Sequence, residues 1–414
     1  MKRSFQIFIS LITVVSFCTA NAQIGNSKRA SDKRLISPDL FGIFFEDLNY
    51  AADGGLYAEL VQNRSFEYSP GDRIDWDHFT SWEFFINRDA IANISIESTN
   101  PVHPNNPHYL QFKIENGTGG TGVKNNGFDG INIQQGEKYI FSLFTRQLSG
   151  NTPLEIKLQS KTGTVYAAAA ITDSKNEWTK QSAVLTATQA DTSAVLTVST
   201  NGKGVLQMDM ISLFPVKTFR NRSNGLRADL AQVIADLKPK FMRFPGGCLV
   251  HGNGVNNIYN WKNTIGAVET RAAQPNIWRY HQTLGLGYFE YFQFCEDIDA
   301  KPLPVIAAGV SCQNSGHTRG TGQACVPMAD MQQYTQDILD LIEYANGPVT
   351  STWGSKRAAS GHPAPFNLTY VGIGNEDKIT PEFEERFKLI YEAIKSKYPE
   401  IIVIGTVGPA PDGG

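Results

Sequence analysis

Apolar runs and helical stretches alternate along the chain from residue 219 onward. Four short, mainly apolar runs are typical of strands, and they lie at residues 241–244, 302–308, 370–374 and 401–405. Apolar residues at helical spacing fill the intervals, at residues 226–237, 288–298, 328–345 and 381–398. This alternation predicts parallel strands joined by right-handed helical crossovers.

A further apolar run at residues 41–46 adds a fifth strand near the beginning of the chain. A helix-like stretch follows it, in which Leu56, Leu60 and Val61 come near helical spacing. A (β/α)8 barrel needs eight strands. Because residues 408–414 lie where the loop after a fifth strand belongs, we interpret the fold as an incomplete (β/α)8 TIM barrel of about five strands rather than another α/β fold.

Residues 76–216 change to short runs in which apolar and polar residues alternate. Seven such runs lie at residues 91–97, 109–114, 139–146, 154–159, 183–187, 194–198 and 206–214. They are separated by turn residues, among them the Asn-Gly pairs at 116–117, 126–127 and 201–202. Many short strands broken by turns predict an antiparallel jelly-roll β-sandwich inserted into the barrel.

The N-terminus has the residue order of a secretory signal. Lys2 and Arg3 precede an apolar run at residues 5–17, and Ala22 ends a small-residue site for cleavage. The run is shorter than the roughly 20 residues that a membrane span requires, which disfavours a membrane anchor. We therefore predict a secreted or periplasmic protein. Its expected organisation is a signal peptide, the first barrel strand with the segment after it, the sandwich and the rest of the barrel, at residues 1–22, 35–70, 76–216 and 219–414.

Charge and composition narrow the range of partners. The net charge of −3 gives no electrostatic reason to expect nucleic acid or an anionic membrane as a partner. The seven histidines form no HExxH-type cluster and the cysteines lack metal-knuckle spacing, so the sequence predicts neither a metal nor a cofactor. Cys312 and Cys325 bracket a polar, glycine-rich loop, and a disulfide between them would suit an oxidising compartment.

Polar residues gather where four successive predicted strands end. In strand order they are Glu46 and Asp47, then Arg243 and residues 245–248, then Ser311 and Gln313, then Asn375 and Glu376. In a parallel barrel, catalytic groups lie just past the carboxyl ends of the strands. An asparagine can bind a sugar hydroxyl and a glutamate can donate a proton, so this cluster is a candidate active site.

Five sequence blocks, in this order, resemble the signature blocks of the family 51 α-L-arabinofuranosidases, which are retaining glycosidases built on (β/α)8 barrels. They lie at residues 41–47, 53–60, 63–67, 243–247 and 374–376. The sandwich is similar to carbohydrate-binding modules of the family 4/9 type, at residues 106–110, 127–131, 178–180 and 209–215. The resemblance implies an enzyme that releases terminal α-L-arabinofuranosyl groups from arabinan, arabinoxylan or related oligosaccharides.

The resemblance also implies roles for four strand-end residues. Glu376 would be the acid/base, and Asn375 would bind the 2-hydroxyl of the sugar. Glu46 would bind other hydroxyls of the arabinofuranosyl ring. Arg243 would lie beneath the site and orient its carboxylates.

Other residues have two interpretations each. Cys248 stands where many relatives have asparagine, so it is either a substrate contact or a packed thiol. Trp261 matches an aromatic residue of the substrate cleft, with core packing as the alternative. In the sandwich, Trp82, Tyr139 and Trp178 could stack on sugar rings or belong to the core.

A retaining glycosidase needs two carboxyl groups, about 5–5.5 Å apart. The resemblance implies that the nucleophile is a glutamate on a later barrel strand, and no such strand precedes Gly414. We therefore expect the 414-residue chain by itself to lack half of its catalytic pair and to be inactive.

Alternative functions remain at this stage. A non-catalytic protein could use the barrel remnant and the sandwich to bind glycans, and the missing nucleophile favours it for the chain as printed. A second alternative is an endo-acting glucanase or xylanase on the same barrel. The expected partner is an arabinose-containing polysaccharide or oligosaccharide, and a homo-oligomer stays open.

Overall fold

A computed structural model describes residues 36–87, 89–318 and 322–408, so the predicted signal peptide lies outside the described residues. The described residues from Asp39 onward form one compact unit by their contacts. Within the part of the chain that the structure describes, no helix combines the length and apolarity needed to cross a membrane.

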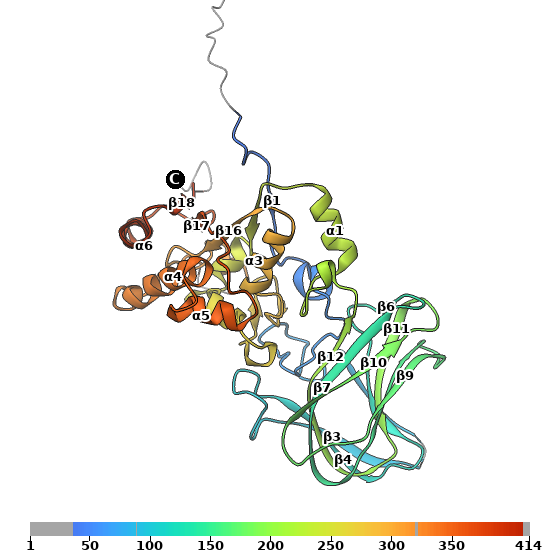
Figure 1. The fold of residues 1–414 in the computed structure, drawn as a ribbon. Helices are drawn as coiled ribbons and strands as arrows, with labels where there is room; N and C mark the ends of the chain where they lie inside the picture. The colour runs from blue at the N-terminus through green and yellow to red at the C-terminus, as the bar shows by residue number, and fades with distance from the viewer. Residues whose placement is uncertain (1–35, 88, 319–321, 409–414) are drawn as a thin grey trace, which may run out of the picture. The chain divides into compact units, whose positions relative to one another are not determined.

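Five strands form one parallel sheet, in which they follow one another in chain order (Figure 1). In order they are β1 (Ile43–Phe44), β13 (Phe241–Phe244), β16 (Lys301–Ile306), β17 (Tyr370–Ile373) and β18 (Ile402–Gly405). The five predicted barrel strands are therefore confirmed. This sequential order is that of a (β/α)8 barrel, and the described residues supply five of its strands.

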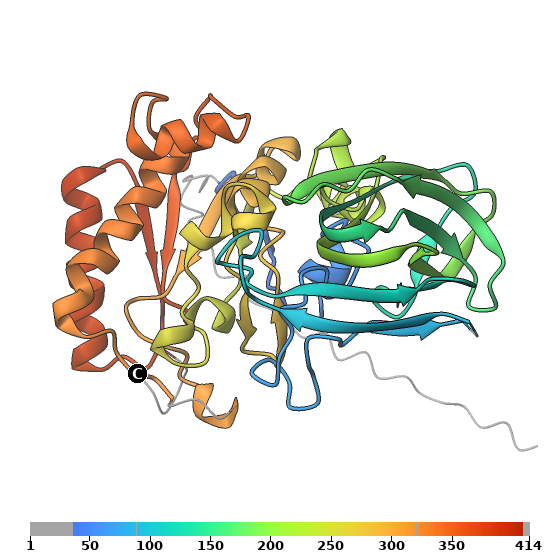
Figure 2. The same ribbon diagram turned by 90° about the horizontal axis from the view of Figure 1, so that it is seen from below.

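Helices connect these strands. They are α1 (Ala228–Asp236), α2 (Cys248–His251), α3 (Tyr288–Asp297), α4 (Met331–Asn346), α5 (Thr352–Ala359) and α6 (Pro381–Lys397). The four predicted helices are confirmed as α1, α3, α4 and α6, and the latter two lie beside each other along the parallel strands (Figure 2). Helix α6 begins where the Thr380 hydroxyl caps the Phe383 amide at 3.3 Å and Pro381 occupies the first turn.

The helix expected around Leu56 and Val61 is wrong. Only a single π-turn forms (η1, Ala52–Leu56), and it contains Gly54 at φ +85°. Beyond it the backbone is extended, and the Leu60 amide bonds to the Leu213 carbonyl at 3.0 Å. Long-range backbone pairing thus replaces the local i to i+4 bonds that the apolar spacing suggested.

The sandwich consists of two antiparallel sheets. The first contains, in order, β10 (Thr179–Thr186), β7 (Lys138–Asn151), β12 (Lys203–Pro215), β4 (Tyr109–Asn116) and β3 (Ile91–Glu97). The second contains β2 (Trp82–Ile86), β5 (Thr121–Asn125), β11 (Asp191–Thr200), β8 (Leu154–Gln159) and β9 (Val165–Ile171), with β6 (Ile131–Ile133) paired to β11. All seven predicted strands are confirmed, whereas β2, β5, β6 and β9 were not foreseen.

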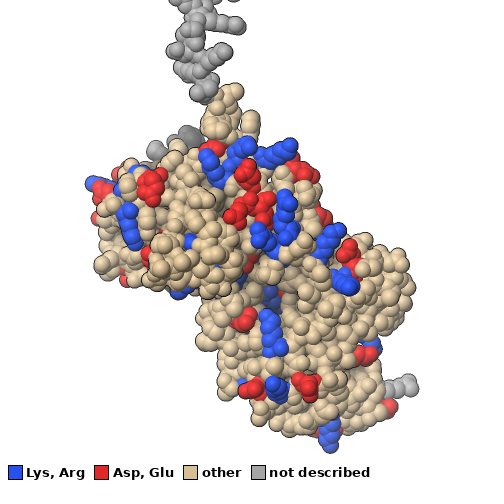
Figure 3. All heavy atoms as spheres, in the orientation of Figure 1, with Lys and Arg blue, Asp and Glu red and all other residues tan. Residues whose placement is uncertain are grey.

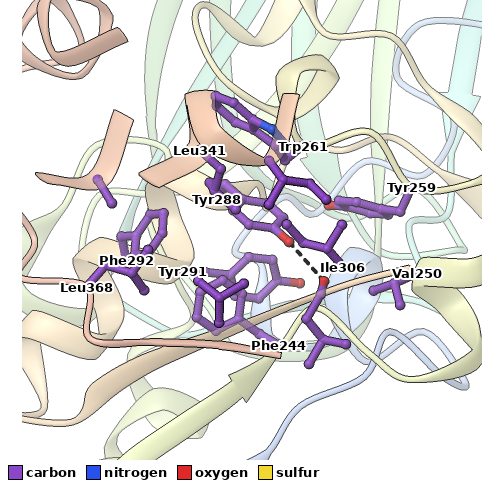
Figure 4. Packing of buried hydrophobic residues seen from close by; sticks show 14 of the residues in the cluster. Phe244, Val250, Tyr259, Trp261, Tyr288, Tyr291, Phe292, Ile306, Leu341 and Leu368 are labelled. Atoms are coloured by element: carbon purple, nitrogen blue, oxygen red, sulfur yellow. Dashed lines mark hydrogen bonds between the residues drawn. The ribbon is translucent and has the colours of Figure 1, made fainter. Parts of the chain in front are cut away.

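The barrel core is rich in aromatic residues (Figure 4). Phe244 stacks on Tyr291 with ring centroids 4.8 Å apart, and it meets Tyr288 and Phe292 edge-on. The Tyr288 hydroxyl donates to the Val305 carbonyl at 3.2 Å, which satisfies its polar end inside the core. These contacts fix β13 and α3 directly behind the strand ends that carry polar residues.

Candidate active site

Glu46 lies just past β1 and is half-buried. Its Oε1 atom accepts hydrogen bonds from the backbone amides of Gly247, at 3.1 Å, and Leu249, at 3.0 Å. A Cβ atom on Gly246 would come within 2.8 Å of the Glu46 Cγ atom, so glycine is needed there. One carboxylate oxygen of Glu46 is thereby fixed to the first turn of α2.

Arg243 comes from β13, the next strand of the sheet. Its guanidinium carbon lies 4.1 Å from the centroid of the Phe44 ring, and Nη2 donates to Asn375 Oδ1 at 2.5 Å. Burial lowers the pKa of Arg243, while the carboxylates of Glu46 and Glu376 oppose this change. Arginine stays protonated in proteins, so Arg243 places a positive charge near the carboxylates of Glu46 and Glu376.

Asn375 and Glu376 follow β17 on a tight turn with Gly374 at φ +85° and Glu376 at φ +51°. The Glu376 side chain is exposed, and its Oε2 atom lies 3.5 Å from Asn375 Nδ2. A Cβ atom on Gly247 would come within 2.7 Å of Asn375 Oδ1. The loops after β13 and β17 are therefore in direct contact, and the structure brings together Glu46, Arg243, Asn375 and Glu376.

Cys248 begins α2 beside this group and is buried. It packs with Cys312, Ile277 and the half-buried Trp278. The four described cysteines are free, so Cys312 and Cys325, whose pairing the sequence left open, are not bridged. A hydrogen bond between the Cys248 and Cys312 side chains raises the pKa of the first thiol and lowers that of the second to about 7.

Trp261 lies in the barrel core, where its side chain is only 4% exposed. Its ring centroid is 5.0 Å from that of Trp353 and 5.5 Å from that of Tyr344. Its indole Nε1 donates to the Asp337 carbonyl at 2.8 Å. Core packing accounts for every one of these contacts.

The sandwich aromatics are also largely engaged with the protein. Trp82 and Tyr139 belong to the sandwich core. Trp178 is half-buried, donates from Nε1 to the Asn100 carbonyl at 2.9 Å and has the Arg146 guanidinium 4.7 Å from its ring centroid.

On the face in Figure 3, basic and acidic side chains are interspersed among a larger uncharged surface, consistent with the net charge of −3.

Sequence reasoning missed two residues beneath the strand ends, His251 and Asp377. The Asp377 carboxylate accepts from the backbone amide of Asn375 at 2.9 Å and lies 3.0 Å from the His251 ring. Both side chains are fully buried. Asp377 directly follows Glu376 in the sequence, which was the one available signal. His251 lies on a four-residue helix, too short to show a periodic pattern.

Asp47, next to Glu46, is a buried carboxyl whose pKa is raised to about 7 by burial first and then by the nearby charge of Asp53. It accepts from the Ala52 amide and the Tyr280 hydroxyl, both at 3.0 Å. The folded protein therefore binds this proton more tightly than the unfolded chain, where the pKa is near 3.8. Consequently Asp47 contributes a loss of stability that develops as the pH rises from about 4 to about 7.

We expect Asp47→Asn to remove this pH-dependent loss. The amide keeps an acceptor oxygen and carries no charge, so the stability of the variant relative to the wild type should be up to about 4 kcal/mol greater at pH 8 than at pH 4. Urea unfolding of both proteins at the two pH values measures the difference. A stability difference between the two proteins that is the same at pH 4 and pH 8 would show that Asp47 is ionised in the folded state throughout.

The fold and the site define the class of this protein. Its parallel strands are ordered as in a (β/α)8 barrel, and charged and amide side chains meet at their carboxyl ends, where barrel enzymes carry their active sites. Residues 233–412 match the family described as the α-L-arabinofuranosidase 1 domain, and residues 58–204 match a carbohydrate binding domain. The chain thus carries the arabinofuranosidase domain of glycoside hydrolase family 51 together with a carbohydrate-binding domain.

Individual relatives agree with this assignment. The chain is 43% identical to an extracellular exo-α-L-arabinofuranosidase of Streptomyces chartreusis, over 90% of this chain and 44% of that protein. It is 37% identical to α-L-arabinofuranosidase 2 of Arabidopsis thaliana, over 90% of this chain and 54% of the relative. An arabinose-bound family 51 α-L-arabinofuranosidase has a similar structure, with a TM-score of 0.79 and 33% identity over 90% of this chain and 60% of that one. The chain spans about half the length of the curated relatives it matches.

Proposed function

We propose that the protein is a secreted retaining α-L-arabinofuranosidase that removes terminal arabinofuranosyl groups from arabinan, arabinoxylan or related oligosaccharides. The observation that carries the proposal is the convergence of Glu46, Arg243, Asn375 and Glu376 at adjacent strand ends. The similarity to proteins named α-L-arabinofuranosidases over 90% of the chain supports the choice of sugar.

The hydrogen bonds suggest how these groups would meet a sugar. Arg243 donates to the Asn375 oxygen, so the amide nitrogen of Asn375 is left facing Glu376, ready to donate to a hydroxyl. Glu46 uses Oε1 for two backbone amides, which leaves Oε2 to accept hydrogen bonds from hydroxyl groups. Fixed donors and acceptors of this kind orient a substrate without reorganising during the reaction.

Glu376 is proposed to protonate the departing oxygen and then, as a base, to activate the water that releases the sugar. Its exposed position past β17 gives it access to substrate. The attacking carboxylate is proposed to be a glutamate from a further barrel strand, as the family resemblance implies. Glu46 suits that role less well, because one of its oxygens is held by two amides.

Secretion is proposed from the signal-like residues 1–22 together with the extracellular relative of Streptomyces chartreusis. The sandwich is proposed to be a carbohydrate-binding module. Its candidate stacking residues mostly serve the core, so we expect any contribution to polymer binding to centre on Trp178.

The proposal is tested with the protein as its gene encodes it. We expect release of aryl alcohol from an aryl α-L-arabinofuranoside, with NMR showing that the first-formed arabinose keeps the substrate's anomeric configuration. Hydrolysis of unsubstituted xylan or β-glucan without action on the arabinofuranoside would instead support an endo-acting enzyme. Binding of arabinoxylan with no hydrolysis would support the non-catalytic alternative.

A further inference from the structure

The His251–Asp377 pair lies immediately behind the proposed acid/base, and the structure connects it to both loops of the site. Asp377 Oδ2 accepts from the backbone amide of Asn375 at 2.9 Å, and Asp377 Oδ1 lies 3.0 Å from His251 Nε2. His251 Nδ1 lies 3.2 Å from the Gly247 carbonyl oxygen. Both side chains of the pair are 0% exposed, so bulk solvent does not compete for these contacts.

These contacts continue into the groups that would touch substrate. The Gly247 amide donates to Glu46, and Gly247 is the position whose Cβ atom would strike the Asn375 side chain. Arg243 then holds the Asn375 oxygen from below. A continuous path of contacts therefore runs from the loop after β1, through α2 and the buried pair, to the loop after β17.

The hydrogen bond to Gly247 fixes one proton of His251. The Gly247 carbonyl can only accept, so His251 Nδ1 carries a proton, and Nε2 lies 3.0 Å from the Asp377 carboxylate. Burial acts to lower the pKa of His251, but the contact with Asp377 outweighs it and raises the value. The loop itself is also strained, because Glu376 has φ +51°.

We infer that His251 and Asp377 are positioning residues that hold the Asn375–Glu376 loop against Gly247, so that the Glu376 carboxyl reaches the departing oxygen. This inference rests on the proposed function. Neither side chain reaches the surface, so the pair would act on catalysis through the loops that it contacts, above all the loop that carries Asn375 and Glu376. Fixing the acid within a fraction of an ångström is worth large factors in rate.

Two variants separate positioning from simple packing. Asp377→Asn keeps a side-chain oxygen that can accept from the backbone N–H of Asn375. Its side-chain NH2 group can donate to a neutral His251, so the loop should stay in place. The double variant His251→Leu/Asp377→Leu removes both links but leaves no unpaired buried charge, and such replacements commonly preserve or raise stability. His281 and Asp72 form a second buried pair, also at 3.0 Å, and His281→Leu/Asp72→Leu is the matched control.

The first readout is leaving-group dependence, measured with the protein as its gene encodes it. Protonation by Glu376 matters for a phenyl arabinofuranoside and hardly at all for a 2,4-dinitrophenyl one. We expect the double variant to lose at least about tenfold in kcat/KM on the phenyl substrate and less than about threefold on the dinitrophenyl substrate. Asp377→Asn and the control pair should keep the wild-type ratio between the substrates.

The second readout needs no substrate. Hydrogen exchange followed by mass spectrometry should show faster exchange across residues 374–377 in His251→Leu/Asp377→Leu and wild-type exchange in Asp377→Asn. Unchanged exchange together with an unchanged substrate ratio in the double variant would overturn the inference. If the wild-type protein is inactive on both substrates, the proposed function is refuted. If the double variant nevertheless shows faster exchange across residues 374–377 than the wild type, the holding role of His251 and Asp377 still stands.

Discussion

Replacing Glu376 by alanine is expected to lower kcat/KM on a phenyl α-L-arabinofuranoside by about 10²–10⁴-fold. The carboxyl group is exposed beyond β17 with Asn375 Nδ2 as its polar neighbour, so its loss should remove the proton donor without disturbing the core. Thermal unfolding should change little, because surface substitutions generally alter stability by less than about 0.5 kcal/mol. Steady-state kinetics on phenyl and dinitrophenyl substrates measure the effect.

Azide provides a sharper test of the same residue. With a dinitrophenyl substrate the first step needs no acid, so the glycosyl-enzyme of Glu376→Ala should accumulate and await a base. Azide needs no base to attack, and it should restore turnover and yield an arabinosyl azide of retained configuration. Glu385, an exposed glutamate on α6, gives the control variant Glu385→Ala, which should behave as wild type. Undiminished turnover by Glu376→Ala would remove it from the mechanism.

Replacing Trp261 by alanine is expected to destabilise the barrel by about 3–5 kcal/mol. The substitution empties a space lined by Trp353, Tyr344 and Tyr288, and it leaves the half-buried Asp337 carbonyl without its indole donor. Chemical denaturation followed by circular dichroism measures the loss.

Trp261→Phe separates the two contributions. The smaller phenyl ring still fills most of the space but lacks the N–H group, so its cost should be lower, nearer 1–2 kcal/mol. Normal stability in Trp261→Ala together with a raised KM would instead make Trp261 a residue of the substrate cleft.

The barrel strands could be predicted from sequence because short apolar runs alternate with stretches of helical periodicity, the pattern of parallel strands joined by helices. The strand-end rule then located Glu46, Arg243, Asn375 and Glu376, which the structure brings together. The sandwich was only partly predictable. Strand β9 contains four successive alanines and β5 contains a glycine, so neither shows strong alternation of apolar and polar residues.

Other features depended on contacts that no local pattern encodes. The spacing of Cys312 and Cys325 suggested a bridge, but Cys312 packs instead on Cys248 from a different strand end. Leu56 and Val61 had helical spacing, yet the backbone there pairs with distant segments. The contact between His251 and Asp377 joins two loops that are remote in sequence, and only the folded sheet brings them together.

The sandwich lies in the chain between β1 and β13, and this affects the order in which the site can form. Glu46 must find an amide 201 positions away, and closing so long a loop costs chain entropy. However, Leu60 bonds to the Leu213 carbonyl and Tyr57 bridges to Leu226, so the two ends of the insertion are tied together. Once the sandwich has folded, far fewer flexible residues separate the first two barrel strands, so the loop that remains to be closed is much shorter. Nucleation of the insertion would thus precede assembly of the catalytic pocket, and slow-folding sandwich mutants should delay the gain of activity during refolding.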